Sequence, residues 1–108
     1  MVELDVALRP EGPAVYRHLT VNKQLAPAGV VDQKQIRSAV RHAAGVTTYE
    51  LQIPIEQVGL KPLQAGQVLR VSMLLNANDG RGRQTTEWFG GIKEAKDPTL
   101  FGHLILAQ

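Results

Sequence analysis

The chain has 108 residues, of which 44% are hydrophobic and 20% charged, and its formal net charge is +2. This composition is ordinary for a globular domain and argues against a disordered segment, while the scattered Lys and Arg argue against a nucleic-acid surface. The absence of cysteine excludes disulfides, thiolate metal sites and a cysteine nucleophile.

The first half of the chain reads as strands joined by turns. Residues 2–8 alternate apolar and polar side chains, the period of a half-buried strand, and residues 9–13 (RPEGP) then supply a turn. The return strand is predicted over residues 14–20, with Tyr16 and His18 on one face. Residues 21–31 are expected to be a loop.

Two further strands are predicted before the middle of the chain. Residues 36–43 are assigned to a strand, although their apolar residues also fit the spacing of a short helix. Residues 47–55 alternate most clearly, and Pro54 indicates an edge position or the strand's end. Residues 56–60 then predict one helical turn closed by a glycine.

The second half continues in the same manner. We expect strands at residues 68–75, 84–89 and 104–106, with a strong turn at residues 76–80 (NANDG). Short strands, turn-rich connections and little helix predict an all-β fold, an antiparallel β-sandwich with immunoglobulin-like or jelly-roll-like layers, over a single domain of residues 1–108.

Membrane spans, a signal peptide and the start of the chain can also be considered from the sequence. No stretch approaches a membrane span, and acidic residues stand where a signal peptide would be basic, so neither feature is predicted. The chain starts directly in a strand, which suggests a piece of a longer domain or protein. An uncovered sheet edge in such a piece would favour pairing as a homodimer.

Residues 49–108 resemble the C-terminal part of family 9-type carbohydrate-binding modules and the related DOMON-like domains. The resemblance lies in residues 49–55 (YELQIPI), 78–80 (NDG), 87–92 (EWFGGI), 96–102 (KDPTLFG) and 104–106 (LIL). It implies a shortened, non-catalytic sugar-binding domain attached to a carbohydrate-active or cell-surface protein, extracellular or periplasmic. Some relatives bind haem, which is a further alternative.

A sugar site needs an exposed aromatic ring and side chains that hydrogen-bond hydroxyls. Trp88 and Phe89 are adjacent on a predicted strand, so one is expected outside and the other inside. Either Trp88 is the exposed platform, or Phe89 points outward and Trp88 is a core anchor. Tyr49 and Phe101 are expected in the core. The complete predicted carbohydrate site comprises Trp88, Glu87, Arg83, Arg81, Asn78, Asp79 and a second ring, Tyr16.

The same turn offers a calcium alternative, because Asn76, Asn78 and Asp79 carry oxygen ligands at alternating spacing; otherwise no cofactor is expected. Haem would need axial ligands, for which the candidates are Met73, His18, His42 and His103. Catalysis is not expected, since no metalloprotease histidine pair or nucleophile elbow occurs. The remaining alternative is a structural module that docks onto a partner domain or another copy of itself.

Overall fold

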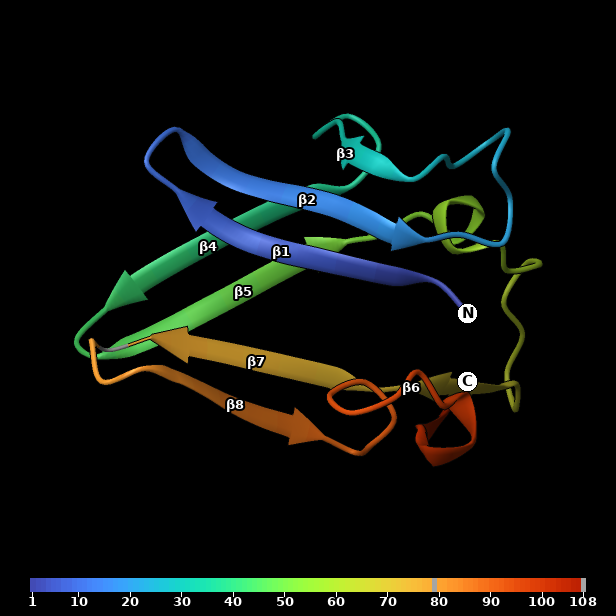
Figure 1. The fold of residues 1–108 in the computed structure, drawn as a ribbon. Coiled ribbons are helices and arrows are strands. Elements are labelled where there is room, and N and C mark those ends of the chain that lie inside the picture. The colour runs from blue at the N-terminus through green and yellow to red at the C-terminus, as the bar shows by residue number, and fades with distance from the viewer. Residues whose placement is uncertain (79, 108) are drawn as a thin grey trace. The chain divides into compact units, whose positions relative to one another are not determined.

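The computed structural model describes residues 1–78 and 80–107, and these form an all-β structure (Figure 1). Every strand pair is antiparallel. The predicted all-β antiparallel class is therefore confirmed, and the sheets are compatible with a β-sandwich. The chain divides into two compact units, Met1–Pro62 (unit 1) and Leu63–Gln108 (unit 2).

Unit 1 opens with a three-stranded sheet in the order β1-β2-β3. The strands are β1 (Glu3–Arg9), β2 (Gly12–Leu19) and β3 (Gly29–Val31). The β1–β2 hairpin turns where the sequence predicted a turn. The expectation of a loop over residues 21–31 is wrong at its end, because β3 lies there; three residues are too few to produce a recognisable alternation.

The inner face of this sheet forms the core of unit 1. Leu4 and Val6 of β1 pack against the buried cluster of Val15, Val31 and Ile36. Ile36 is fully buried. Full burial of an aliphatic side chain such as those of Val15, Val31 and Ile36 contributes roughly 1.5–3 kcal/mol. The opposite side chains of β1 and β2 consequently face outward.

The second sheet of unit 1 pairs β4 (Arg37–Ala43) with β5 (Val46–Gln52). The strand interpretation of residues 36–43 is thus confirmed over the helical one. All seven residues of β5 are exposed. Tyr49, expected in the core, is 42% exposed; the prediction was wrong because alternation alone does not show which face becomes covered.

A short 3-10 helix, η1 (Ile55–Val58), follows β5 and ends at Gly59, whose left-handed backbone closes it as predicted. Arg17 connects β2 to this region. Its Nη2 donates to Gln57 Oε1 at 2.6 Å, and its Nη1 donates to the Pro27 carbonyl at 2.9 Å. Arg17 is only 2% exposed, so a guanidinium with neutral acceptors is buried inside unit 1.

Unit 2 contains two antiparallel strand pairs, β6-β9 and β7-β8. The strands are β6 (Val68–Val71), β7 (Met73–Asn78), β8 (Arg83–Trp88) and β9 (Gly102–Ile105). The single strand expected over residues 68–75 is therefore divided at Ser72. The two halves pair with different partners, a choice that the apolar pattern of one strand does not encode.

The segment between β8 and β9 contains the 3-10 helix η2 (Pro98–Leu100). Asp97 caps this helix: its Oδ1 accepts from the Thr99 backbone N–H at 3.0 Å and from the Thr99 hydroxyl at 2.6 Å. Pro98 stands at the first helical position, where its fixed φ suits the helix and its missing N–H would have no partner inside the helix. In the described part of the chain, no helix has the length and hydropathy needed to cross a membrane.

Asp97 gives unit 2 an acid-sensitive cap. The hydrogen bonds from the Thr99 hydroxyl and then the Thr99 N–H lower the pKa of this carboxyl below its usual 3.8. A lowered folded-state pKa stabilises the fold above 3.8, and this contribution is lost as the pH falls through the lowered value. We expect Asp97→Ala to have a shallower acid limb than the wild type in pH-dependent urea unfolding.

Asp97→Asn is the matched variant for this expectation, because a neutral amide oxygen still caps the helix without titrating. It should retain more stability than Asp97→Ala at neutral pH while showing the same shallow acid limb. Identical acid limbs in the wild type and both variants would contradict the assignment of the cap.

Candidate functional site

The outer face of the β1-β2-β3 sheet carries a hollow of about 340 Å³. We call it the Tyr16 hollow. Its lining includes Asp5, Ala7 and Arg9 of β1, Ala14, Tyr16 and His18 of β2, and Val30 of β3. A volume of this size lies at the lower end of the range of small-molecule sites, which is roughly 300–1,000 Å³.

The strand register explains why these side chains meet. Tyr16 pairs with Asp5 on one side and with Val30 on the other. Ala7 pairs with Ala14 at the next position on the same face of the hairpin, so two small side chains lie next to Tyr16. Large groups beside small ones on one face leave a depression, and the Tyr16 side chain at its edge is 43% exposed.

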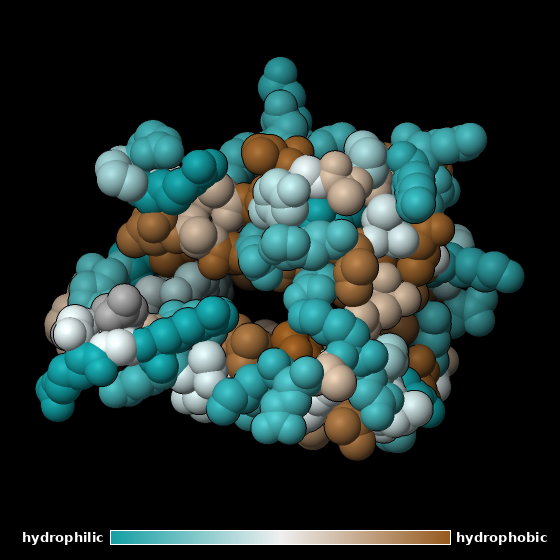
Figure 2. Space-filling view, viewed as in Figure 1, coloured by the Kyte–Doolittle hydropathy of each residue, from teal (hydrophilic) through white to brown (hydrophobic). Residues whose placement is uncertain are grey.

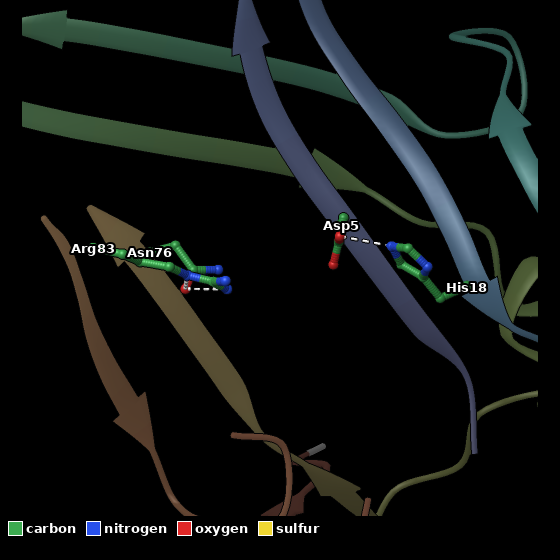
Figure 3. Close-up of polar contacts among 4 residues, drawn as sticks. All are labelled: Asp5, His18, Asn76 and Arg83. Carbon is green, nitrogen blue, oxygen red and sulfur yellow. Dashed lines mark hydrogen bonds and ion pairs between the residues drawn. The ribbon is translucent and has the colours of Figure 1, made fainter. Parts of the chain in front are cut away.

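His18 and Asp5 interact across the hairpin (Figure 3), with 2.7 Å between His18 Nε2 and Asp5 Oδ2. The ladder skips His18, because Glu3 pairs with Leu19 and Leu4 with Arg17. Such a bulge re-aims a side chain. An ionised carboxylate only accepts hydrogen bonds, so Nε2–H donates, and in the neutral imidazole Nδ1 is left as an acceptor.

The rings of Tyr16 and His18 lie close together, with centroids 4.7 Å apart and planes tilted by 53°. Arg9 lies on the same face at the turn end of β1. Its Nε is 3.7 Å from Glu11 Oε1, and both side chains are more than half exposed. An exposed pair at this distance contributes little, so the guanidinium can reorient towards a ligand.

Trp88, the predicted platform, lies at the end of β8 and is 53% exposed. The register pairs Trp88 with Met73 and Thr86 with Leu75. These four side chains share one face by strand alternation, and that face carries no formal charge along β7 and β8. Hydrophobic residues also reach the surface elsewhere, as Figure 2 shows on the visible side.

Two of the predicted polar partners of Trp88, Glu87 and Arg83, lie on the opposite face of the hairpin. Glu87 and Arg83 alternate with Trp88 along β8, and Asn76 is diagonal to Arg83. Arg83 donates from Nε and Nη2 to Asn76 Oδ1 at 3.0 and 2.9 Å (Figure 3). Glu87 Oε1 accepts from the backbone N–H groups of residues 92 and 93 at 2.8 and 3.1 Å. These side chains therefore stabilise the hairpin and the following loop.

Phe89 does not obey the expected alternation. It follows the end of β8 and has a φ of +64°, which turns its ring back towards Trp88. The two ring centroids are 4.6 Å apart, and Phe89 is 46% exposed. The expectation that one ring lies inside and the other outside was wrong, because the strand period ends with the strand.

The remaining predicted ligands are partly described. Arg81 lies in the exposed turn after β7. Asp79 and the side chain of Asn78 lie outside the described residues. The oxygen of Asn76 already accepts two hydrogen bonds from Arg83, which disfavours its use as a calcium ligand. No group of three or more acidic, histidine or cysteine side chains suited to a metal occurs among residues 1–78 and 80–107.

The candidate haem ligands are separated between the units. His18 belongs to the Tyr16 hollow, and His42 Nδ1 lies 2.7 Å from the Thr47 hydroxyl. Met73 and His103 belong to unit 2, in β7 and β9. Among the described residues, the hydrogen bonds and ring contacts of His18 and His42 are made to Asp5, Tyr16 and Thr47, and not to another of these candidate ligands.

Sequence reasoning identified Tyr16 but missed Asp5 and Arg9 as its neighbours. A usable signal was present. A tight turn after Arg9 places residues 5 and 16 opposite each other, and alternation then puts residues 5, 7, 9, 14 and 16 on one face.

Comparisons of this chain with protein-family models, curated proteins and solved structures find no match. The resemblance of residues 49–108 to family 9-type carbohydrate-binding modules and DOMON-like domains therefore stays a prediction.

Proposed function

We propose that this chain is a non-catalytic glycan-binding module and that the Tyr16 hollow is its principal site. The observation that supports the proposal is the exposed Tyr16 ring at the edge of a hollow whose two ends carry hydrogen-bonding side chains. The resemblance supports the same class of function. On the basis of this resemblance we also propose that the parent protein is carbohydrate-active or cell-surface, and that it is extracellular or periplasmic.

Stacking on Tyr16 would supply the apolar part of recognition. The C–H groups of a pyranose form a flat, weakly positive surface that packs against the negative face of an aromatic ring. The neighbouring His18 ring, whose centroid is 4.7 Å away and whose plane is tilted by 53°, adds a second aromatic surface at an angle to the first. Ala7 and Ala14 leave room for the sugar beside the ring.

Hydrogen bonds from the rim would supply the polar part. Asp5 uses Oδ2 in its contact with His18, and Oδ1 makes no hydrogen bond to the described residues. Asp5 Oδ1 and His18 Nδ1 are acceptors for sugar hydroxyls, the Tyr16 hydroxyl donates or accepts, and Arg9 donates. Donors and acceptors on opposite sides of a ring match the paired hydroxyls of a sugar.

Trp88 supports the same function in unit 2 through its exposed indole. Thr86 is beside it on the same face and offers a hydroxyl. Two of the charged partners expected for Trp88, Arg83 and Glu87, are instead engaged on the opposite face. We therefore assign Trp88 a secondary contribution.

The exposed aliphatic residues of β7 favour a second candidate function, an interaction module. Met73 and Leu75 are 51% and 54% exposed beside Trp88. Under this alternative, Met73 and Leu75 would contact a partner domain or a second copy of the chain. Concentration-dependent mass in sedimentation equilibrium, abolished by Leu75→Lys, would support self-association in place of glycan binding.

The proposal predicts a loss of sugar binding in Tyr16→Ala. Removing the ring should weaken binding of the best ligand by about tenfold or more, because an aromatic contact contributes roughly 1 kcal/mol beyond its buried area. A panel of mono- and oligosaccharides titrated by calorimetry and by ¹H–¹⁵N NMR would measure this. Shifts should centre on Asp5, Tyr16 and His18.

Tyr49→Ala is the matched control, because Tyr49 is equally exposed but lies on β5 outside the hollow. It should bind as the wild type does. Trp88 fluorescence, followed in the same titrations, reports whether the sugar also contacts Trp88. Equal binding by both tyrosine variants would contradict the site, and no response to any glycan would contradict the function.

A further inference from the structure

The charges around the Tyr16 hollow are separated along β1. Asp5 and Arg9 face the same side, four residues apart, and Ala7 lies between them. At about 3.4 Å per residue their Cα atoms are about 14 Å apart. The hollow thus has a carboxylate end, where Asp5 contacts His18, and a guanidinium end beside the turn.

We propose that the Tyr16 hollow selects an acidic sugar, a residue that carries a carboxylate such as a uronic acid. The inference rests on the proposed function. The carboxylate of the sugar would bind the Arg9 guanidinium, its ring would stack on Tyr16, and its hydroxyls would bond to Asp5 and His18.

Arg9 suits a carboxylate for two reasons. Its guanidinium presents a planar fork of N–H donors that binds two carboxylate oxygens at once. Its one ion pair within residues 1–78 and 80–107 is the 3.7 Å contact to Glu11, made through Nε, so the Nη donors are left for a ligand. A sugar carboxylate would displace Glu11 at little cost.

The position of Asp5 is compatible with this orientation. A sugar carboxylate that is hydrogen-bonded to Arg9 lies much nearer to the guanidinium than to Asp5, which is four residues away along β1, and the Coulomb energy falls with distance. The attraction to Arg9 therefore exceeds the repulsion from Asp5. His18 also donates a hydrogen bond to Asp5, which disperses the negative charge at that end.

Calorimetric titration with trigalacturonate and with its neutral counterpart galactotriose tests the proposal. The acidic trimer should bind about tenfold more tightly than the neutral one at low salt, and added NaCl should reduce the difference. Arg9→Ala should remove this preference, Arg9→Lys should retain part of it, and Glu11→Gln should strengthen acidic binding severalfold by freeing the guanidinium.

Arg41→Ala is the matched control, since it removes the same charge from an exposed position on β4 outside the hollow. It should keep the preference. Equal binding of both trimers, lost in Tyr16→Ala and unchanged in Arg9→Ala, would overturn acidic selectivity and leave glycan binding intact. Binding of neither trimer nor any other glycan would overturn both proposals together.

Discussion

Replacing Arg17 with alanine is expected to destabilise unit 1 by about 3 kcal/mol. Truncation leaves the Gln57 side-chain oxygen without its donor inside unit 1, and an unsatisfied buried acceptor costs about 1–3 kcal/mol. The part-buried bond to the Pro27 carbonyl is lost as well. The long side chain also fills space between β2 and η1, because Arg17 is almost fully buried. Urea unfolding followed by far-UV circular dichroism measures the loss.

The partner of Arg17 provides the decisive comparison. Gln57→Leu removes the shortest hydrogen bond and leaves a buried cation with a single neutral acceptor, so it should also cost about 2 kcal/mol. Arg17→Met keeps much of the volume without the charge. In the double variant, Arg17→Met with Gln57→Leu, an apolar pair replaces a polar one, so the losses should be strongly less than additive.

The Arg17 experiment also bears on the site. Tyr16 and Arg17 are adjacent on β2 with side chains on opposite faces, so the buried arginine holds the strand that presents the Tyr16 ring. Amide hydrogen exchange should therefore accelerate first in β2 and η1 of Arg17→Ala. Additive losses in the double variant, with exchange unchanged in β2, would show that Arg17 does not act as this connection.

In unit 1 the sequence predicted the strands more successfully than it predicted which side chains are buried. The period-2 alternation of residues 2–8 and 14–20, with turn residues between them, was sufficient to identify the β1–β2 hairpin. The same reasoning placed Tyr49 in the core, where it is not found. Alternation identifies two faces of a strand, while burial depends on a second surface that lies elsewhere in the chain.

The candidate site was predicted in part. Tyr16 and Trp88 are exposed, as a sugar platform requires. The polar residues chosen near Trp88 were selected by proximity in sequence, and in a strand immediate neighbours point to opposite faces. Pairing across the hairpin, which joins Asp5 to Tyr16, is the relation that assembles a site on a sheet.

Replacing Gly91 with alanine is expected to destabilise unit 2 by more than about 3 kcal/mol. Gly91 has a φ of +87°, a conformation that costs an L-residue about 1 kcal/mol or more. A Cβ at this position would also overlap the backbone carbonyl of Asp97 and come within 3.0 Å of the Phe101 ring. Because the obstacle is backbone, the loop itself would have to move, breaking the 3.1 Å bond from Asp97 N–H to the Gly91 carbonyl.

Gly66→Ala separates the two causes. Gly66 has a similar φ of +81°, but no atom lies within 4 Å of an added Cβ. It should therefore cost only the conformational term, about 1 kcal/mol. Trp88 fluorescence during urea unfolding reports unit 2 directly, because Trp88 contacts Phe89 just before Gly91. Equal losses in the two variants would mean that the loop accommodates a Cβ at residue 91, and that close packing of Gly91 against the Asp97 carbonyl does not stabilise unit 2.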